Sequence, residues 1–157
     1  MDTEGLFAPE TRDEAREYYE TLAPAAGAVV RETARAMSFD SEEYDRRVTG
    51  AVVDTAREAL FASLLEVTVG TREEYEAWCS DHEADPIELG SEHVDNVVWH
   101  AAPFAAVVVA ATFQDERDAA VDTLRRQAFG RIYSDFLVER ADSDGSEVAD
   151  GGARKNG

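Results

Sequence analysis

Apolar residues recur at helical spacing through the first third of the chain and predict helices there. Thr11 and Glu14 have the spacing of a capping box, which opens a helix. Pro24 ends or kinks this helix, because proline has no backbone N–H with which to continue it. The predicted apolar stripes are Ala15, Tyr18, Tyr19 and Leu22 in the first helix, and Ala26, Val29, Val30, Thr33 and Met37 in the second.

A third apolar stripe predicts one longer helix after a second cap at Asp40 and Glu43. Gly50 lies inside this stripe and weakens the predicted helix a little. The apolar residues recur every four positions, at Tyr44, Val48, Val52, Ala56, Leu60 and Leu64.

An uncharged run, NVVWHAAPFAAVVVAATFQ, extends from Asn96 to Gln114 in a chain that is 31% charged. Its two halves are rich in β-branched residues and flank a turn at Ala102 and Pro103, which predicts two buried strands. The second half is apolar on both faces, as expected of an interior strand that is covered on both sides. The run is long enough for a membrane helix, but its alanines, its proline and its acidic flanks are not typical of one. We therefore expect no membrane partner.

Four further segments complete the predicted elements. LLEVTV predicts a strand that leads into a turn at Gly70, and Thr71 with Glu74 predicts a capped helix. Ile87–Leu89 predicts a short edge strand, and Asp115 starts a long helix. The apolar faces of these two helices are Tyr75, Trp78, Cys79 and His82, and then Val121, Leu124, Ala128, Ile132 and Phe136.

Together these elements predict a single α+β domain over residues 5–140. It has N-terminal helices, a small and mostly antiparallel sheet, and a long C-terminal helix. Residues 141–157 have no periodicity and are mostly Asp, Ser, Gly and other small residues, so we expect a disordered acidic tail.

The charge of the chain points to a salt-rich environment. The formal net charge is -19, from 34 acidic and 15 basic residues, and Lys155 is the single lysine. Such an excess of carboxylates is repulsive at low salt and keeps a protein hydrated in molar salt. It also argues against nucleic acid as a partner, because a nucleic-acid binder needs a basic surface. The first residues have neither a basic start nor an apolar stretch, so we expect no secretion signal and a cytoplasmic protein.

The sequence has no GxGxxG, P-loop, GxSxG, HExxH or CxxC motif. Cys79 and His82 are three residues apart, and His93 and His100 follow, which are ligand types that suit zinc. Cys79 could also form a nucleophilic pair with His82 or His100. Since Cys79 and His82 share a stripe with Tyr75 and Trp78, the simpler interpretation is a core face. We predict no metal and no cofactor.

Three residues are candidates for a ligand site. Trp99 and His100 are adjacent on a strand and must point to opposite faces. His100 is the weak candidate for a catalytic acid or base, with a hydrogen-bonded core histidine as the simpler interpretation. Arg125 falls inside the apolar stripe of the last helix, where a buried guanidinium needs a partner. Arg125, Arg126 and Trp99 are therefore predicted to bind a small anionic ligand, unless Arg125 only extends its head to solvent or to a structural carboxylate.

The opposite face of the last helix is small and uncharged, which is unusual in so acidic a chain. It consists of Thr123, Gln127, Gly130 and Ser134. Because a second helix could cover this face, we favour a homodimer formed through the C-terminal helix.

The segments VVWHAAPF, ATFQDER and LRRQAFGRIY resemble an uncharacterised protein family of halophilic archaea. The resemblance covers about residues 5–138 and implies a haloarchaeal cytoplasm. It implies no activity and no role for any residue.

Three functional hypotheses follow. The leading one is a non-enzymatic binding or regulatory module, because no acid, base and nucleophile converge in the sequence. The alternative is a small enzyme that acts on an anionic metabolite, with Arg125 and Arg126 as a clamp and His100 as acid or base. The third is an architectural protein that acts only through assembly with a partner.

Overall fold

The computed structural model describes residues 1–138 of the 157-residue chain. The helices are α1 (Arg12–Thr21), α2 (Ala23–Ala36), α3 (Ser41–Arg47), α4 (Gly50–Ser63), α5 (Arg72–His82), α6 (Arg117–Ala128) and α7 (Ser134–Leu137), with a 3-10 turn at Pro103–Ala105 and a π-helical turn at Phe129–Tyr133. The strands are β1 (Asp2–Glu4), β2 (Val67–Thr71), β3 (Asp85–Leu89), β4 (Asn96–Ala102) and β5 (Val107–Phe113). The predicted α+β class is confirmed, while the predicted tail at 141–157 lies outside the described residues.

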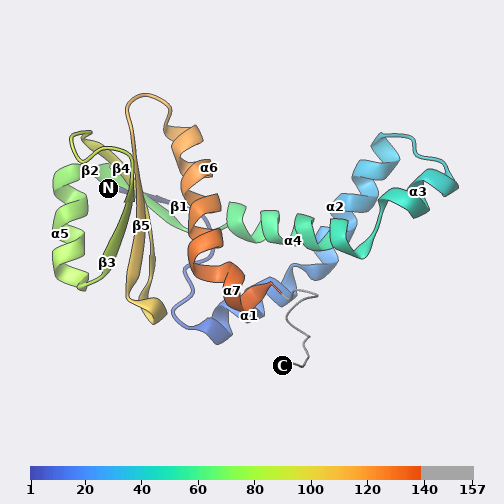
Figure 1. Cartoon of the computed structure of the whole chain (residues 1–157), viewed down its shortest axis with the longest axis horizontal. Coiled ribbons are helices and arrows are strands. Elements are labelled where there is room, and N and C mark those ends of the chain that lie inside the picture. The colour runs from blue at the N-terminus through green and yellow to red at the C-terminus, as the bar shows by residue number, and fades with distance from the viewer. Residues whose placement is uncertain (139–157) are drawn as a thin grey trace, which may run out of the picture.

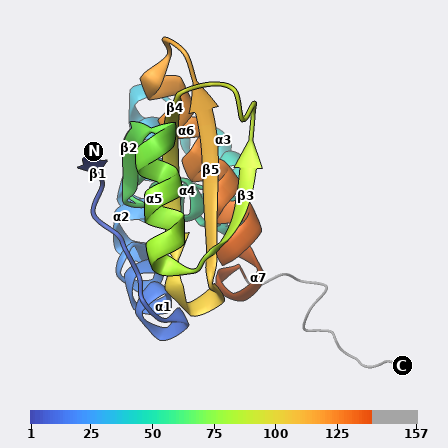
Figure 2. The same ribbon diagram turned by 90° about the vertical axis from the view of Figure 1, so that its left-hand side faces the viewer.

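A five-stranded sheet forms the centre of the fold, with the strand order β1-β2-β4-β5-β3. Neighbouring strands are antiparallel except for β3, which runs parallel to β5 at one edge. The uncharged run supplies β4 and β5, as predicted, and β5 is interior. Figures 1 and 2 show α5 against one face of the sheet and α6 against the other.

Each face of the sheet carries its own apolar core. Trp99 and Val97 of β4 pack on the α5 side with Tyr75. Val98 of β4 packs on the α6 side, where α1 and the end of α4 also contribute. Residues alternate between these two cores because successive side chains of a strand point to opposite faces.

Helices α2, α3 and α4 form an arm, defined here as residues 23–63, that projects away from the sheet (Figure 1). The single helix predicted across Tyr44–Leu64 is wrong, because Val48 and Thr49 separate α3 from α4. The Thr49 hydroxyl accepts a hydrogen bond from the Val52 N–H at 3.3 Å and starts α4 afresh. The apolar stripes of the arm are also less buried than predicted, since Val29 is 46% exposed and Val52 is 42% exposed.

Two local predictions need correction, and one strand was not predicted. Gly70 lies inside β2 and not in a turn, and β1 was not predicted at all. The long C-terminal helix is interrupted by the π-helical turn at Phe129–Tyr133. A π turn inserts one residue into the helical repeat, so Tyr133 and Leu137 are buried as well as the predicted Ile132, while Phe136 is only partly buried.

Within residues 1–138, no helix is both long enough and apolar enough to cross a membrane. The uncharged run that raised this alternative forms the β4–β5 hairpin instead.

Candidate functional site

A shallow groove of about 350 Å³ runs along the arm between α2 and α4. Arg47 is the single charged side chain among the described residues that line it. The lining residues are Val29, Val30, Thr33, Ala34, Phe39, Arg47, Val48, Val52, Thr55, Ala56 and Ala59. In a chain with 31% charged residues, an exposed surface of this composition is unusual.

The arm has little core of its own beneath this groove. Over their 14 residues each, α2 buries Ala26, Val30 and Ala34, and α4 buries Phe61 and Ala62 at the end next to the sheet. Helix α3 buries none of its residues. Because a helix in a protein derives most of its stability from packing its apolar face, the arm has an apolar face that residues 1–138 leave uncovered.

A second hollow of about 480 Å³ continues the groove towards the sheet. It shares Thr55 and Ala59 with the groove and is also lined by Arg125 and Arg126 of α6. Two of the three predicted ligand residues therefore lie together at the base of the arm. Glu58 and Asp122 line the same hollow, so its charge is mixed rather than purely basic.

Arg125 is half-buried, and its guanidinium binds backbone carbonyls rather than a carboxylate. Its Nε donates to the Leu65 carbonyl at 2.9 Å, and its Nη2 donates to the Glu4 carbonyl at 3.4 Å. The side chain thereby ties α6 to β1 and to the segment before β2. Arg126 is exposed, and its Nη2 donates to the Thr123 hydroxyl at 3.4 Å.

His100 is 2% exposed, and both of its ring nitrogens have partners inside the fold. Nδ1 lies 2.6 Å from the Glu66 carbonyl and Nε2 lies 2.7 Å from the Tyr133 hydroxyl. A carbonyl oxygen only accepts, so Nδ1 carries the proton and Nε2 accepts from Tyr133. Burial lowers the pKa of His100 to about 4, and burial also raises the pKa of Tyr133. The pair is therefore neutral at pH 7.

His100 lines a different hollow from the two arginines, of about 170 Å³, together with Glu66 and Trp99. The hollow that contains Arg125 and Arg126 does not include His100. Trp99, the third predicted ligand residue, is 1% exposed and faces α5 on the opposite side of the sheet. The structure thus brings Arg125 and Arg126 together and separates them from Trp99.

The cysteine and histidines that suited zinc are dispersed. His82 stacks on Trp78 with ring centroids 4.1 Å apart, and its Nδ1 lies 2.9 Å from the Trp78 carbonyl. Cys79 is half-buried beside Tyr75, and burial raises the pKa of its thiol. Across the described part of the chain, no three His, Cys, Asp or Glu residues are grouped so that they could hold a metal ion.

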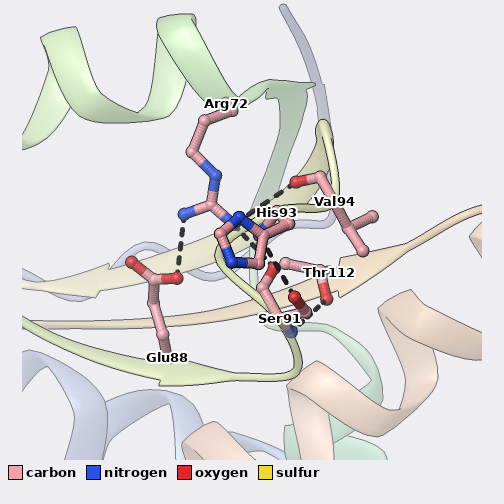
Figure 3. Close-up of polar contacts among 6 residues, drawn as sticks. All are labelled: Arg72, Glu88, Ser91, His93, Val94 and Thr112. Atoms are coloured by element: carbon pink, nitrogen blue, oxygen red, sulfur yellow. Dashed lines mark hydrogen bonds and ion pairs between the residues drawn. The ribbon is translucent and has the colours of Figure 1, made fainter.

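Figure 3 shows a polar cluster around Arg72, which the sequence did not single out. Nη1 of Arg72 donates to Glu88 at 2.8 Å, and Nη2 donates to the carbonyls of Ser91 and Val94 at 3.1 and 3.3 Å. The side chain is 13% exposed. Because this cation binds groups of its own chain, it clamps the loop between β3 and β4 onto the start of α5.

The uncharged face of the last helix is accessible in the single chain. Gly130 is exposed, and a Cβ added there would meet nothing within 4 Å. Gln127 accepts a hydrogen bond from Arg131 Nε at 3.1 Å. A homodimer through this face stays a prediction.

The different environments of the two arginines predict different effects on stability. Arg125→Met should lower the free energy of unfolding by about 1–3 kcal/mol, because buried carbonyls lose their donor. Arg126→Met is the matched control and should change it by less than about 0.5 kcal/mol. Denaturant titration of the two variants measures both values, and equal losses would contradict the assignment of Arg125 to the interior.

The buried histidine predicts a pH dependence of stability. Its pKa of about 4 in the fold lies below the ordinary value of about 6.5, so the unfolded chain binds the extra proton in this window. The stabilisation is present above pH 6.5 and is lost as the pH falls towards 4, by at most about 1.4 kcal/mol per pH unit. His100→Gln should flatten this slope in denaturant titrations between pH 7 and pH 5. The same slope in both proteins would show that His100 already accepts a proton in the fold.

Comparison with known proteins gives a family without an assigned activity. No curated protein and no solved structure matches the chain. A family model matches residues 6–134, which include the arm, strands β2 to β5 and α6. The chain therefore belongs to a family of unknown function (DUF5809).

Proposed function

We propose that this chain is a non-enzymatic protein-binding module that holds an apolar helical surface of a partner in the groove of its arm. The observation that carries the proposal is the groove itself, with exposed Val29 and Val52 on its two walls and Arg47 as its one charged side chain among the described residues. Amphipathic helices bind in such grooves through apolar side chains spaced three or four residues apart.

The energetics favour covering this surface. Full burial of a valine side chain contributes roughly 1.5–3 kcal/mol relative to exposure. Val29 and Val52 are each almost half exposed, and they flank the small side chains of Thr33, Thr55 and Ala59, which let a helix approach closely. A partner helix would supply the packing layer that residues 1–138 do not give the arm.

The surroundings of His100 support binding over catalysis. A catalytic acid or base has to reach the proton that it transfers. His100 is 2% exposed, and its two nitrogens are engaged by Glu66 and Tyr133. Arg125 and Arg126 line a hollow that lacks this histidine, so an anion held there would have no acid or base from His100.

The proposed setting is a cytoplasm rich in salt, supported by the net charge of -19. In molar salt the Debye length is roughly 3 Å, and contacts between surface charges lose most of their range. Apolar contacts do not depend on that range. A mostly apolar groove, with Arg47 as its one charged side chain among the described residues, is therefore a suitable recognition surface for a protein that works under such conditions.

Site-specific photo-crosslinking tests the proposal. A photoreactive amino acid at Val52, inside the groove, should give an adduct with a protein when the full chain is irradiated in its native cells. The matched control is Ala28 of α2, which is exposed but does not line the groove, and it should give none. Absence of a protein adduct at Val52, or equal adducts at both positions, would contradict a binding role for the groove.

A further inference from the structure

Within residues 1–138, the two ends of the arm carry exposed charges without an ionic partner, which are carboxylates at the tip and Arg126 beside Asp122 at the base. At the tip, Glu42 and Asp45 of α3 are exposed and have no cationic partner within residues 1–138. The basic residues of the tip are already engaged, since Glu43 pairs with Arg46 at 3.6 Å and with Arg47 at 3.0 Å.

At the base of the arm Arg126 has no ionic partner within residues 1–138, in a hollow that Asp122 also lines. Arg126 is exposed, and its guanidinium reaches the neutral Thr123 hydroxyl rather than a carboxylate of the described chain. Arg126 also lines the hollow in which the groove ends. The groove therefore runs from an acidic tip to a base where Arg126 has no carboxylate partner in the described part of the chain.

The surface between these ends can pack against a copy of itself. A two-fold interface uses the same patch on both subunits, so the patch must be self-complementary. The groove walls are uncharged apart from Arg47, and small side chains such as Ala56 and Ala59 allow close approach of a second pair of helices. No repulsion between like charges opposes this contact over most of its length.

The lengths of the helices fix the direction of such a pairing. Helices α2 and α4 have 14 residues each, which corresponds to about 21 Å at 1.5 Å per residue. If two arms lie antiparallel, the tip of each reaches the base of the other. A parallel arrangement would instead bring the acidic tips together, along with the two bases.

We propose that the partner in the groove is a second copy of this chain, and that two arms pack antiparallel as a four-helix bundle about a two-fold axis. Glu42 and Asp45 of each copy then face Arg126 of the other, at both ends of the bundle. The inference rests on the proposed function and names its partner. Helices in such bundles cross at about 20°.

The area that a stable dimer must bury explains why both the groove and the tip-to-base contacts are needed. A stable interface buries on the order of 800 Å² per partner. The groove between two helices is narrow and only about 21 Å long, so it supplies a part of that area. The two tip-to-base contacts extend it, and they also set the register, since they form only when the arms overlap along their full length.

Sedimentation equilibrium of the full chain, at micromolar concentration in both 0.2 M and 2 M KCl, is the first test. The wild-type protein should have twice the chain mass of 17.2 kDa. Val52→Glu, which places a charge in the centre of the groove, should weaken self-association on the order of 100-fold. Ala28→Glu adds the same charge to an exposed position outside the groove and should leave the dimer intact.

A charge exchange tests the antiparallel direction. Arg126→Glu should weaken the dimer in 0.2 M KCl, and combining it with Glu42→Arg and Asp45→Arg should restore it. Loss without restoration would exclude the contact between tip and base. All three positions are exposed, so the variants should fold. Circular dichroism of each variant verifies this.

Three results would overturn the inference. They are a monomeric wild-type protein, a dimer that Val52→Glu leaves unchanged, and a dimer that only a change at Gln127 disrupts. The proposed function fails separately. If the chain is monomeric and Val52 still crosslinks to a different protein, the groove is a binding surface and only the identity of its partner is wrong.

Discussion

The β4–β5 hairpin is apolar on both faces, and both faces have to be removed from water. Helix α5 covers the face with Trp99, and α6 covers the face with Val98. His100 is the polar residue buried on the α6 side, and it fits there because Glu66 and Tyr133 take up both of its nitrogens. The π-helical turn that brings Tyr133 into the core is part of the same arrangement.

Covering this hairpin uses α5 and α6 and leaves the arm without a layer to pack against. Only the end of α4, with Phe61, joins the core beside the sheet. The remainder of α2 and α4 projects away from the sheet (Figure 1). Its apolar side chains Val29 and Val52 are exposed. The helices that cover the two faces of the sheet are thus not available to cover the arm, and its groove stays exposed.

Local sequence patterns predicted most of the helices and strands, but not which of them pack against each other. Thr71 and Glu74 form the capping box that their spacing predicted, and the turn after Ala102 separates the two predicted strands. Periodicity identified Val29 and Val52 as apolar positions, yet it cannot tell whether the chain itself covers them. Similarly, the place of Arg125 in an apolar stripe signalled a buried cation. Its acceptor at Leu65 is 60 residues away, which a local pattern cannot reveal.

Hydrogen exchange at several protein concentrations tests the central claim most directly, because it reports on each helix separately. Amides of α2 and α4 should exchange quickly in dilute solution and become protected as the concentration rises. Amides of β4 and β5 should be equally protected throughout, since their cover comes from the same chain. If the arm is as protected as the sheet in dilute solution, or if its exchange does not change with concentration, then the arm is stable without a second copy, which would contradict the proposed pairing of two arms.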